Sequence, residues 1–291
     1  MTHIYLNILG ISDVSMALSP NGWAWLVHGR RLVVWRYAKS STHKPFSANC
    51  RELTLPPSDL AHNAKLVNVF ATNQNQTPSC IAVSPEGIVR YWPSIAHAGS
   101  SYEVNSDVQG QECYSLCDIQ PLGSILTTTT STVVLIYHGE NGSHHGIACR
   151  TLKPPQGLLG GIGRRVSSFI WGGTASGTSG SEAKLVQVLG TSSAGSPGGM
   201  DDPFEKIIYV LTANSFQKWL LSQGDPDKMF YNCDLESIAK LAFAEHLWQN
   251  ENPDPSWIKV WLLDMQMVEK DSVAVLMAAY NPHISQQVCN F

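Results

Sequence analysis

Short runs of apolar residues recur along this chain, each broken by a tight turn and then resumed. Four segments have the pattern of a strand, a turn and a second strand that closes on an aromatic residue, which is typical of β-hairpins. They cover residues 19–35, 81–92, 127–137 and 207–219. A hairpin repeated at uneven intervals predicts an all-β fold, and we favour a β-propeller of roughly four to five blades with loop insertions over a β-sandwich.

Weaker patterns lie between and after these hairpins. Apolar positions at helical spacing over residues 235–248, directly after the acidic residue Asp234, predict one helix between blades. Strands are expected at residues 184–189, 257–267 and 273–280, whereas residues 281–291 show no further repeat. We therefore interpret residues 1–291 as one partial propeller domain whose last strand has an unpaired edge.

A stretch rich in Gly, Ser and Pro, residues 153–202, is expected to be a flexible loop insertion. Within it, residues 157–171 are amphipathic at helical spacing. At about 100° per residue, the apolar positions fall in an arc of roughly 120°, and the opposite face holds mostly Gly and Ser. The apolar positions are Leu158, Leu159, Ile162, Val166, Phe169 and Ile170, and the basic residues Arg164 and Arg165 lie among them.

This segment is too rich in glycine to be a stable helix in water. Its internal glycines cost about 1 kcal/mol each relative to alanine, and an isolated helix of this length is marginal even for good helix formers. Burial of an apolar side chain gains at most about 1.5–3 kcal/mol, whereas an arginine adds about 1 kcal/mol at an anionic surface. Apolar insertion therefore dominates, which favours a curved bilayer with exposed acyl chains as the ligand. The alternative is a loop whose apolar side chains pack on the parent domain.

The composition fits a protein with a substantial hydrophobic core. Of 291 residues, 43% are hydrophobic and 14% are charged, and the formal net charge of −4 gives no sign of a nucleic-acid partner. The seven cysteines are irregularly spaced, which favours reduced thiols in a cytosolic or nuclear compartment. Because the first residues lack a basic signal-peptide region and no apolar run approaches the roughly 20 residues that span a bilayer, we expect any membrane contact to be peripheral.

Motifs for enzymatic chemistry are weak. Gly161 and Gly163 are followed by arginine, so the third glycine of a dinucleotide fingerprint is missing, and no Gly-Lys-Ser or Gly-Lys-Thr phosphate loop occurs. The histidines at positions 138, 144 and 145 surround a Gly-Asn-Ser turn, where a solvated loop is a better interpretation than a metal site. Cys113 and Cys117 are expected on one face of a strand but too far apart to bind one metal ion. We expect no catalytic residue, cofactor, metal or small-molecule substrate.

Four short stretches carry a resemblance to a known family. They are residues 21–27 with 32–35, residues 52–59, residues 89–94 and the string Gly-Ile-Gly-Arg-Arg-Val-Ser-Ser at 161–168. In this order they resemble the N-terminal domain of the nucleoporin 133 family, which are scaffold proteins in the outer ring of the nuclear pore complex. The resemblance extends over about residues 13–280, and the string at 161–168 is its most specific part.

The resemblance implies a seven-bladed propeller with an amphipathic lipid-packing sensor in one loop, which corresponds here to Leu158 to Ile170. It also implies a larger protein whose helical domain binds nucleoporin 107, a domain that this chain lacks. We therefore expect a non-catalytic scaffold component of the nuclear pore complex at the nuclear envelope. It would contact curved membrane and other outer-ring nucleoporins, and so support pore assembly and nucleocytoplasmic transport. The competing hypothesis is a protein-interaction propeller whose loop docks on a partner protein.

Overall fold

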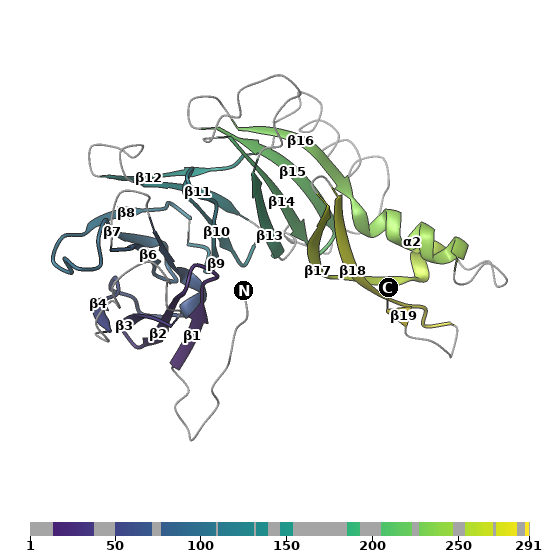
Figure 1. The fold of residues 1–291 in the computed structure, drawn as a ribbon. Helices are drawn as coiled ribbons and strands as arrows, with labels where there is room; N and C mark the ends of the chain where they lie inside the picture. The colour runs from purple at the N-terminus through teal and green to yellow at the C-terminus, as the bar shows by residue number, and fades with distance from the viewer. Residues whose placement is uncertain are drawn as a thin grey trace. The chain divides into compact units, whose positions relative to one another are not determined.

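The strands form five antiparallel sheets in a computed structural model of the chain (Figure 1). The model describes residues 14–37, 50–71, 77–108, 110–130, 132–138, 146–153, 185–192, 205–222, 227–246, 254–269, 272–283 and 289–290. Contacts divide the chain into two compact units. Unit 1 comprises Met1–Thr151 with Met200–Lys206, and unit 2 comprises Leu152–Gly199 with Ile207–Phe291.

Unit 1 contains three sheets of four strands each, and the strands of each sheet follow one another in chain order. Sheet A consists of β1 (Val14–Leu18), β2 (Trp23–His28), β3 (Arg31–Arg36) and β4 (Arg51–Thr54). Sheet B consists of β5 (Val67–Phe70), β6 (Ser79–Val83), β7 (Ile88–Trp92) and β8 (Tyr102–Asn105). Sheet C consists of β9 (Cys113–Asp118), β10 (Ser124–Thr128), β11 (Val133–His138) and β12 (Ile147–Thr151). A meander of four antiparallel strands is the blade of a β-propeller.

Unit 2 contains two further sheets and one helix. Sheet D consists of β13 (Leu185–Ser192), β14 (Lys206–Thr212), β15 (Ser215–Leu221) and β16 (Lys228–Asp234). Helix α2 (Leu235–His246) follows directly, and then sheet E with β17 (Lys259–Glu269), β18 (Ser272–Tyr280) and β19 (Cys289–Asn290). Four four-stranded sheets and one three-stranded sheet in the described part of the chain agree with the predicted four to five blades.

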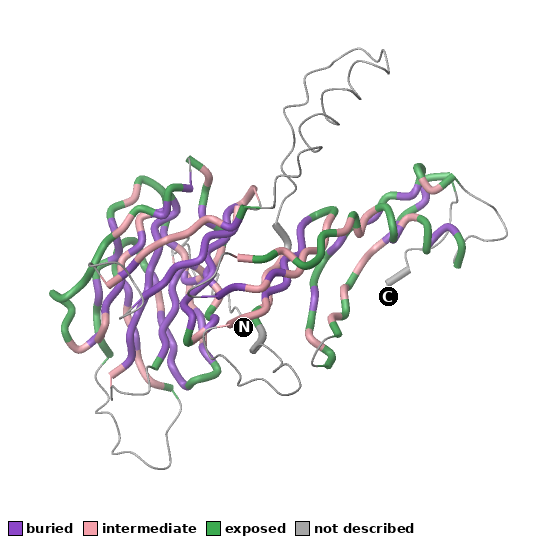
Figure 2. The backbone as a smooth tube through the Cα atoms, turned by 90° about the horizontal axis from the view of Figure 1, so that it is seen from above, coloured by how far each residue is buried: buried purple, intermediate pink, exposed green. Residues whose placement is uncertain are grey.

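Each of the four predicted hairpins is confirmed as the middle pair of strands in a sheet. The pairs are β2–β3, β6–β7, β10–β11 and β14–β15. Among these strands, β6, β10 and β11 are buried at every position, because both of their faces pack on neighbouring side chains, and Figure 2 shows the buried residues of unit 1 in purple. The outer strands β4 and β8 have only four residues each, mostly exposed.

Sheet B lies between sheets A and C and sends alternate residues to two cores. Cys80 and Ala82 of β6 join the cluster with Trp25 and Leu32 of sheet A. Ile81 and Val83 join the cluster that contains Leu126, Val134 and Ile136 of sheet C. This alternation with period two is the direct consequence of strand geometry.

Polar contacts also join the sheets of unit 1. The Trp25 indole Nε1 donates a hydrogen bond to the Ala64 carbonyl at 3.0 Å, in the short 3₁₀ turn before β5. Asn21 donates through Nδ2 to the Val69 carbonyl at 3.0 Å. Buried groups need such partners because an unpaired polar group in a core costs free energy.

The core of unit 2 lies among sheet D, α2 and sheet E. Leu211 contributes from β14, Phe243 from α2, and Val260 and Met265 from β17. Helix α2 begins where the sequence predicts, because the Asp234 carboxylate accepts hydrogen bonds from the Ser237 backbone N–H at 3.0 Å and from its hydroxyl at 2.7 Å.

The structure corrects three local predictions and shows one difference among the closing aromatic residues. Trp257 lies in a 3₁₀ turn before β17 rather than in the strand. The strand 273–280 is not an edge strand along its whole length, because Ala278 and Ala279 pair with β19, where no repeat was expected. Cys113 and Cys117 do not share a face, because a register shift in β9 puts Cys113 and Leu116 into the same cluster instead. Trp35, unlike the other three closing aromatic residues, is only half-buried.

Candidate functional site

The predicted membrane-binding residues lie outside the described part of the chain. They are Leu158, Leu159, Ile162, Arg164, Arg165, Val166, Phe169 and Ile170, and the amphipathic-loop assignment therefore remains a prediction. The predicted loop insertion, residues 153–202, also lies outside the described part of the chain, except for residue 153 and strand β13. The connection that carries these residues runs from β12 to the start of β13.

The start of β13 lies at a defined end of sheet D. In an antiparallel meander, the starts of the first and third strands and the ends of the second and fourth strands share one end of the sheet. The same end therefore carries the β14–β15 turn at Asn214 and the start of α2. A hydrogen bond from the Glu236 N–H to the Asn214 carbonyl, 3.0 Å long, joins these two features. The start of β13, which follows the predicted segment in the chain, therefore lies at the same end of sheet D as the capped helix, with β14 and β15 between β13 and β16.

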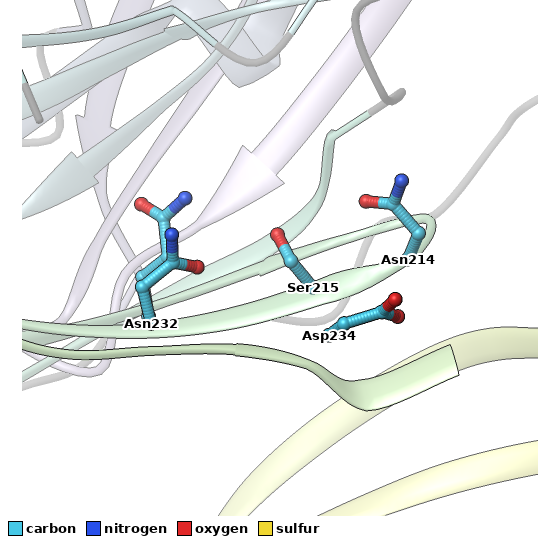
Figure 3. Close-up of a pocket in the computed structure, with 5 residues that line it drawn as sticks. Asn214, Ser215, Asn232 and Asp234 are labelled. Atoms are coloured by element: carbon cyan, nitrogen blue, oxygen red, sulfur yellow. The ribbon is translucent and has the colours of Figure 1, made fainter. Parts of the chain in front are cut away.

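A polar pocket with a cavity volume of about 270 Å³ lies along β15 and β16 (Figure 3). Its lining consists of Asn214, Ser215, Gln217, Asn232 and Asp234. Ser215 pairs with Asp234 and Gln217 pairs with Asn232 across the two strands, so these four side chains share one face of the sheet. These residues were not predicted from the sequence, although polar residues at alternate positions of two adjacent strands are the signal that marks them.

Most polar atoms of this pocket already serve the fold. Gln217 Oε1 accepts a hydrogen bond from the Trp219 indole at 3.0 Å, and Ser215 Oγ lies 2.8 Å from the Thr212 hydroxyl. The hydrogen bonds that Asp234 accepts from Ser237 lower the pKa of its carboxyl group, so it is a stable anion that caps α2. The Ser215 hydroxyl is thus engaged by Thr212 and the Asp234 carboxylate by Ser237, rather than by each other.

His138, Cys113 and Cys149 are titratable groups whose pKa is shifted by burial. Burial lowers the pKa of His138 to about 4, and its ring lies 4.4 Å from Phe70 and 5.4 Å from Tyr91, centroid to centroid. Burial raises the pKa of Cys113 and of Cys149 to about 12, so neither forms the reactive thiolate at neutral pH. Within the described ranges, no three His, Cys, Asp or Glu side chains gather closely enough to hold a metal ion.

The Glu86 carboxylate has a structural role in the connection between sheets A and B. Its carboxylate accepts hydrogen bonds from the Ser58 hydroxyl at 2.9 Å and from the Asp59 and Leu60 backbone N–H groups at 3.0 and 3.1 Å. Partial desolvation raises the pKa of Glu86, but these hydrogen bonds outweigh it and the pKa ends below its ordinary value. The carboxylate thus fixes the connection from sheet A to the turn of sheet B.

Consecutive four-stranded antiparallel meanders define the class of the protein as a β-propeller. The structure of the Nup133 β-propeller domain from Vanderwaltozyma polyspora is similar, with a TM-score of 0.61 and 13% identity over 94% of this chain and 66% of that chain. The Nup170 N-terminal domain of Chaetomium thermophilum, solved in complex with Nup53, gives a TM-score of 0.52 at 10% identity, covering 92% of this chain and 35% of that chain. These two likenesses establish the fold.

Sequence establishes the family. The chain belongs to the Nup133 N terminal like family, whose profile matches residues 12–284. The nuclear pore complex protein Nup133 of Drosophila melanogaster is 34% identical over 96% of this chain, and the human Nup133 is 28% identical over 95%. The chain spans about a quarter of these relatives, 24% and 23% of their lengths. Among the residues that the structure describes, no helix combines the length and apolar character needed to cross a membrane.

Proposed function

We propose that this chain is a non-catalytic scaffold component of the nuclear pore complex that contacts curved nuclear-envelope membrane through residues 157–171. The observation that carries the proposal is an apolar arc of six side chains in a Gly-rich segment, inserted into a β-propeller of the Nup133 N-terminal family. Family membership supports the scaffold role, and other nucleoporins are the expected protein partners.

The proposed mechanism is folding coupled to insertion. In water the glycines disfavour the helix, and burial of the apolar arc in acyl packing defects provides the free energy to form it. Arg164 and Arg165 would stay near the headgroup phosphates, where each adds about 1 kcal/mol. The start of β13 tethers the segment to sheet D, so that membrane binding does not require the propeller to unfold.

Liposome flotation tests the proposal with the change Phe169→Asp. A charge within the apolar arc should abolish binding to small vesicles of neutral lipid, while thermal unfolding stays nearly unchanged. Wild-type chain should bind small vesicles better than large ones, because high curvature exposes more acyl surface. Ser168→Asp on the polar side is the matched control, since it adds the same charge outside the arc.

Two results would contradict this proposal. A large drop in melting temperature for Phe169→Asp would show that Phe169 belongs to a folded core. Equal binding of Phe169→Asp and wild type to small vesicles would show that the arc does not enter the membrane.

A second candidate is a protein-interaction propeller in which the same segment docks into a groove of a partner as an amphipathic helix. The observation in its favour is that a fold neighbour, the Nup170 N-terminal domain, was solved in complex with another protein, Nup53. Flotation separates the two candidates, because a partner groove predicts no vesicle binding and no dependence on vesicle size.

A further inference from the structure

The pocket on sheet D presents amide hydrogens that the fold leaves unused. Thr212 donates its hydroxyl to Asn214 Oδ1 at 3.1 Å, and the Trp219 indole donates to Gln217 Oε1 at 3.0 Å. Both carbonyl oxygens are thus turned to the protein, and the NH₂ groups of the same side chains remain for a ligand. Among the described residues, nothing hydrogen-bonds to the Asn232 side chain, so this amide offers both a donor and an acceptor.

These amides lie on the face of sheet D that points away from the core of unit 2. Phe216 packs against that core, and its neighbours Ser215 and Gln217 point to the other face, because side chains alternate along a strand. In Figure 3, Ser215 and Asn232 stand on the same side of the two strands. Asn232 and Asp234 are exposed. A ligand can therefore reach the pocket without disturbing the core.

The spacing of the lining residues matches the repeat of an extended peptide. Gln217 and Asn232 lie directly opposite each other, and Ser215 and Asp234 form the next pair on the same face. Two residues of a strand span about 6.8 Å, and this distance separates the amide pair from the carboxylate. Backbone groups on one side of an extended peptide repeat at the same interval. A peptide along β15 and β16 therefore places one residue over the amide pair and the residue two positions on beside the carboxylate.

The charge of the pocket selects a basic residue at that second position. None of the five lining residues is basic, and hydrogen bonds from Ser237 hold the pKa of Asp234 below its ordinary value. The Lys240 ammonium, which also acts on Asp234, is paired with Glu236 at 2.7 Å. One negative charge is thus left at this end of the pocket. An arginine or lysine complements it, because hydrogen bonds between charged groups are stronger than those between neutral ones.

We propose that this pocket binds an extended segment of a partner protein that carries an arginine or a lysine. The Asn232 amide donates to the C=O and accepts from the N–H of one residue of the segment, as a residue of a neighbouring strand does. Gln217 and Asn214 donate to further carbonyl oxygens, and the basic side chain lies beside Asp234. At about 270 Å³ the cavity is smaller than the roughly 300–1,000 Å³ of most small-molecule sites, so it holds only a few residues. Binding is accordingly weak, with a dissociation constant on the order of 1 mM.

Side-chain amide signals in NMR spectra test the proposal, with the whole chain labelled by ¹⁵N at asparagine and glutamine. The probe is the peptide acetyl-Gly-Gly-Arg-Gly-Gly-amide, added up to about 10 mM. It should shift the NH₂ signals of Asn232 and Gln217, which are assigned by their loss in single variants. The same peptide with glutamate in place of arginine should bind at least tenfold more weakly.

Three variants separate the parts of the pocket. Asn232→Val removes the free amide and keeps a residue suited to a strand, so it should weaken binding of the arginine peptide at least tenfold. Asp234→Asn keeps the cap of α2 and removes only the charge, so it should bind the two peptides equally. Tyr231→Phe is the matched control, since Tyr231 is 49% exposed and pairs with Lys218 on the opposite face of β16. Thermal unfolding shows whether each variant is folded, and Asp234→Asn serves if Asn232→Val is not.

Several results would overturn the proposal. The arginine peptide could shift neither amide signal, the glutamate peptide could bind as tightly, or Asp234→Asn could keep the preference for arginine. Equal weakening by Tyr231→Phe and Asn232→Val would place the contact elsewhere on β16. Arginine amide alone, without flanking glycines, should bind more weakly than the peptide. Equal affinity would show that the pocket binds a cation rather than an extended chain.

Discussion

His138 ends strand β11 with its ring buried between Phe70 and Tyr91 of sheet B. Its Nε2 lies 2.7 Å from Gln120 Nε2, so the neutral imidazole accepts the amide hydrogen. Protonation would place a charge on a buried ring, which explains why burial lowers its pKa to about 4. The residue stabilises sheets B and C only in its neutral form.

This burial predicts an acid-sensitive fold. The unfolded chain takes up the proton near pH 6.5 and the folded chain only near pH 4, so the free energy of unfolding should fall as pH drops through that window. The loss should reach about 3 kcal/mol below pH 4, from about 1.4 kcal/mol per pKa unit. Urea unfolding at several pH values, on wild type and on His138→Phe, measures it. A variant whose pH dependence matches wild type would assign the effect to other groups.

The sequence predicts the cap of helix α2 but not the cap of the 3₁₀ turn. Asp234 was identified as the residue before a helix, and it caps α2 through Ser237. Asp254 caps the turn Pro255–Trp257 in a similar way, accepting from the Ser256 N–H at 2.8 Å, in a stretch that the sequence pattern assigned partly to a strand. Three residues are too few for a periodic signal, so only the longer element was predictable.

Asp234→Ala should lower the free energy of unfolding by about 1 kcal/mol, because two hydrogen bonds to the first turn of α2 are lost. Asp254→Ala removes a cap from a turn of three residues and should cost less. Chemical unfolding followed by far-UV circular dichroism compares the two variants. Equal losses would mean that α2 is held by Phe243 and its neighbours in the core rather than by its cap.

Strand prediction succeeded where both faces are buried and failed at the edges. The middle hairpins carry long apolar runs, and β6 and β11 are buried at every position. The outer strands β4 (Arg-Glu-Leu-Thr) and β8 (Tyr-Glu-Val-Asn) are short and polar, because solvent covers much of their surface. Strand β16 lacks a clean alternation because a register shift opposite Lys218 inserts Phe230. Pairing, rather than local sequence, therefore defines the edge strands.

The candidate site was predictable only as a sequence pattern. The apolar arc of Leu158 to Ile170 follows from spacing alone, whereas its relation to the fold depends on strand order. The polar row of Gln217 and Asn232 becomes a pocket only because β15 and β16 pair in one register. The alternating polar positions are visible within each strand, but the register that brings them together is not.

At the scale of the whole molecule, the core between sheets A and B should dominate the stability of unit 1. Trp92→Ala should lower the free energy of unfolding by about 3–5 kcal/mol, because Trp92 is 1% exposed within that core and its indole donates to the Ala98 carbonyl. Trp35→Ala is the matched control on β3, and a smaller loss is expected because Trp35 is half-buried. Denaturant unfolding decides it, and equal losses would contradict the burial of the two residues in the fold.

Sheet B, enclosed by sheets A and C, separates the residues that maintain the fold from those that can change. A substitution in β6 meets a packed neighbour whichever way its side chain points, so new side chains there are tolerated only with compensating changes across two sheets. The outer strands and the connections between sheets bear no such restriction. Substitutions in the outer strands and connections can therefore change what this chain binds, while the central hairpins keep the same packing.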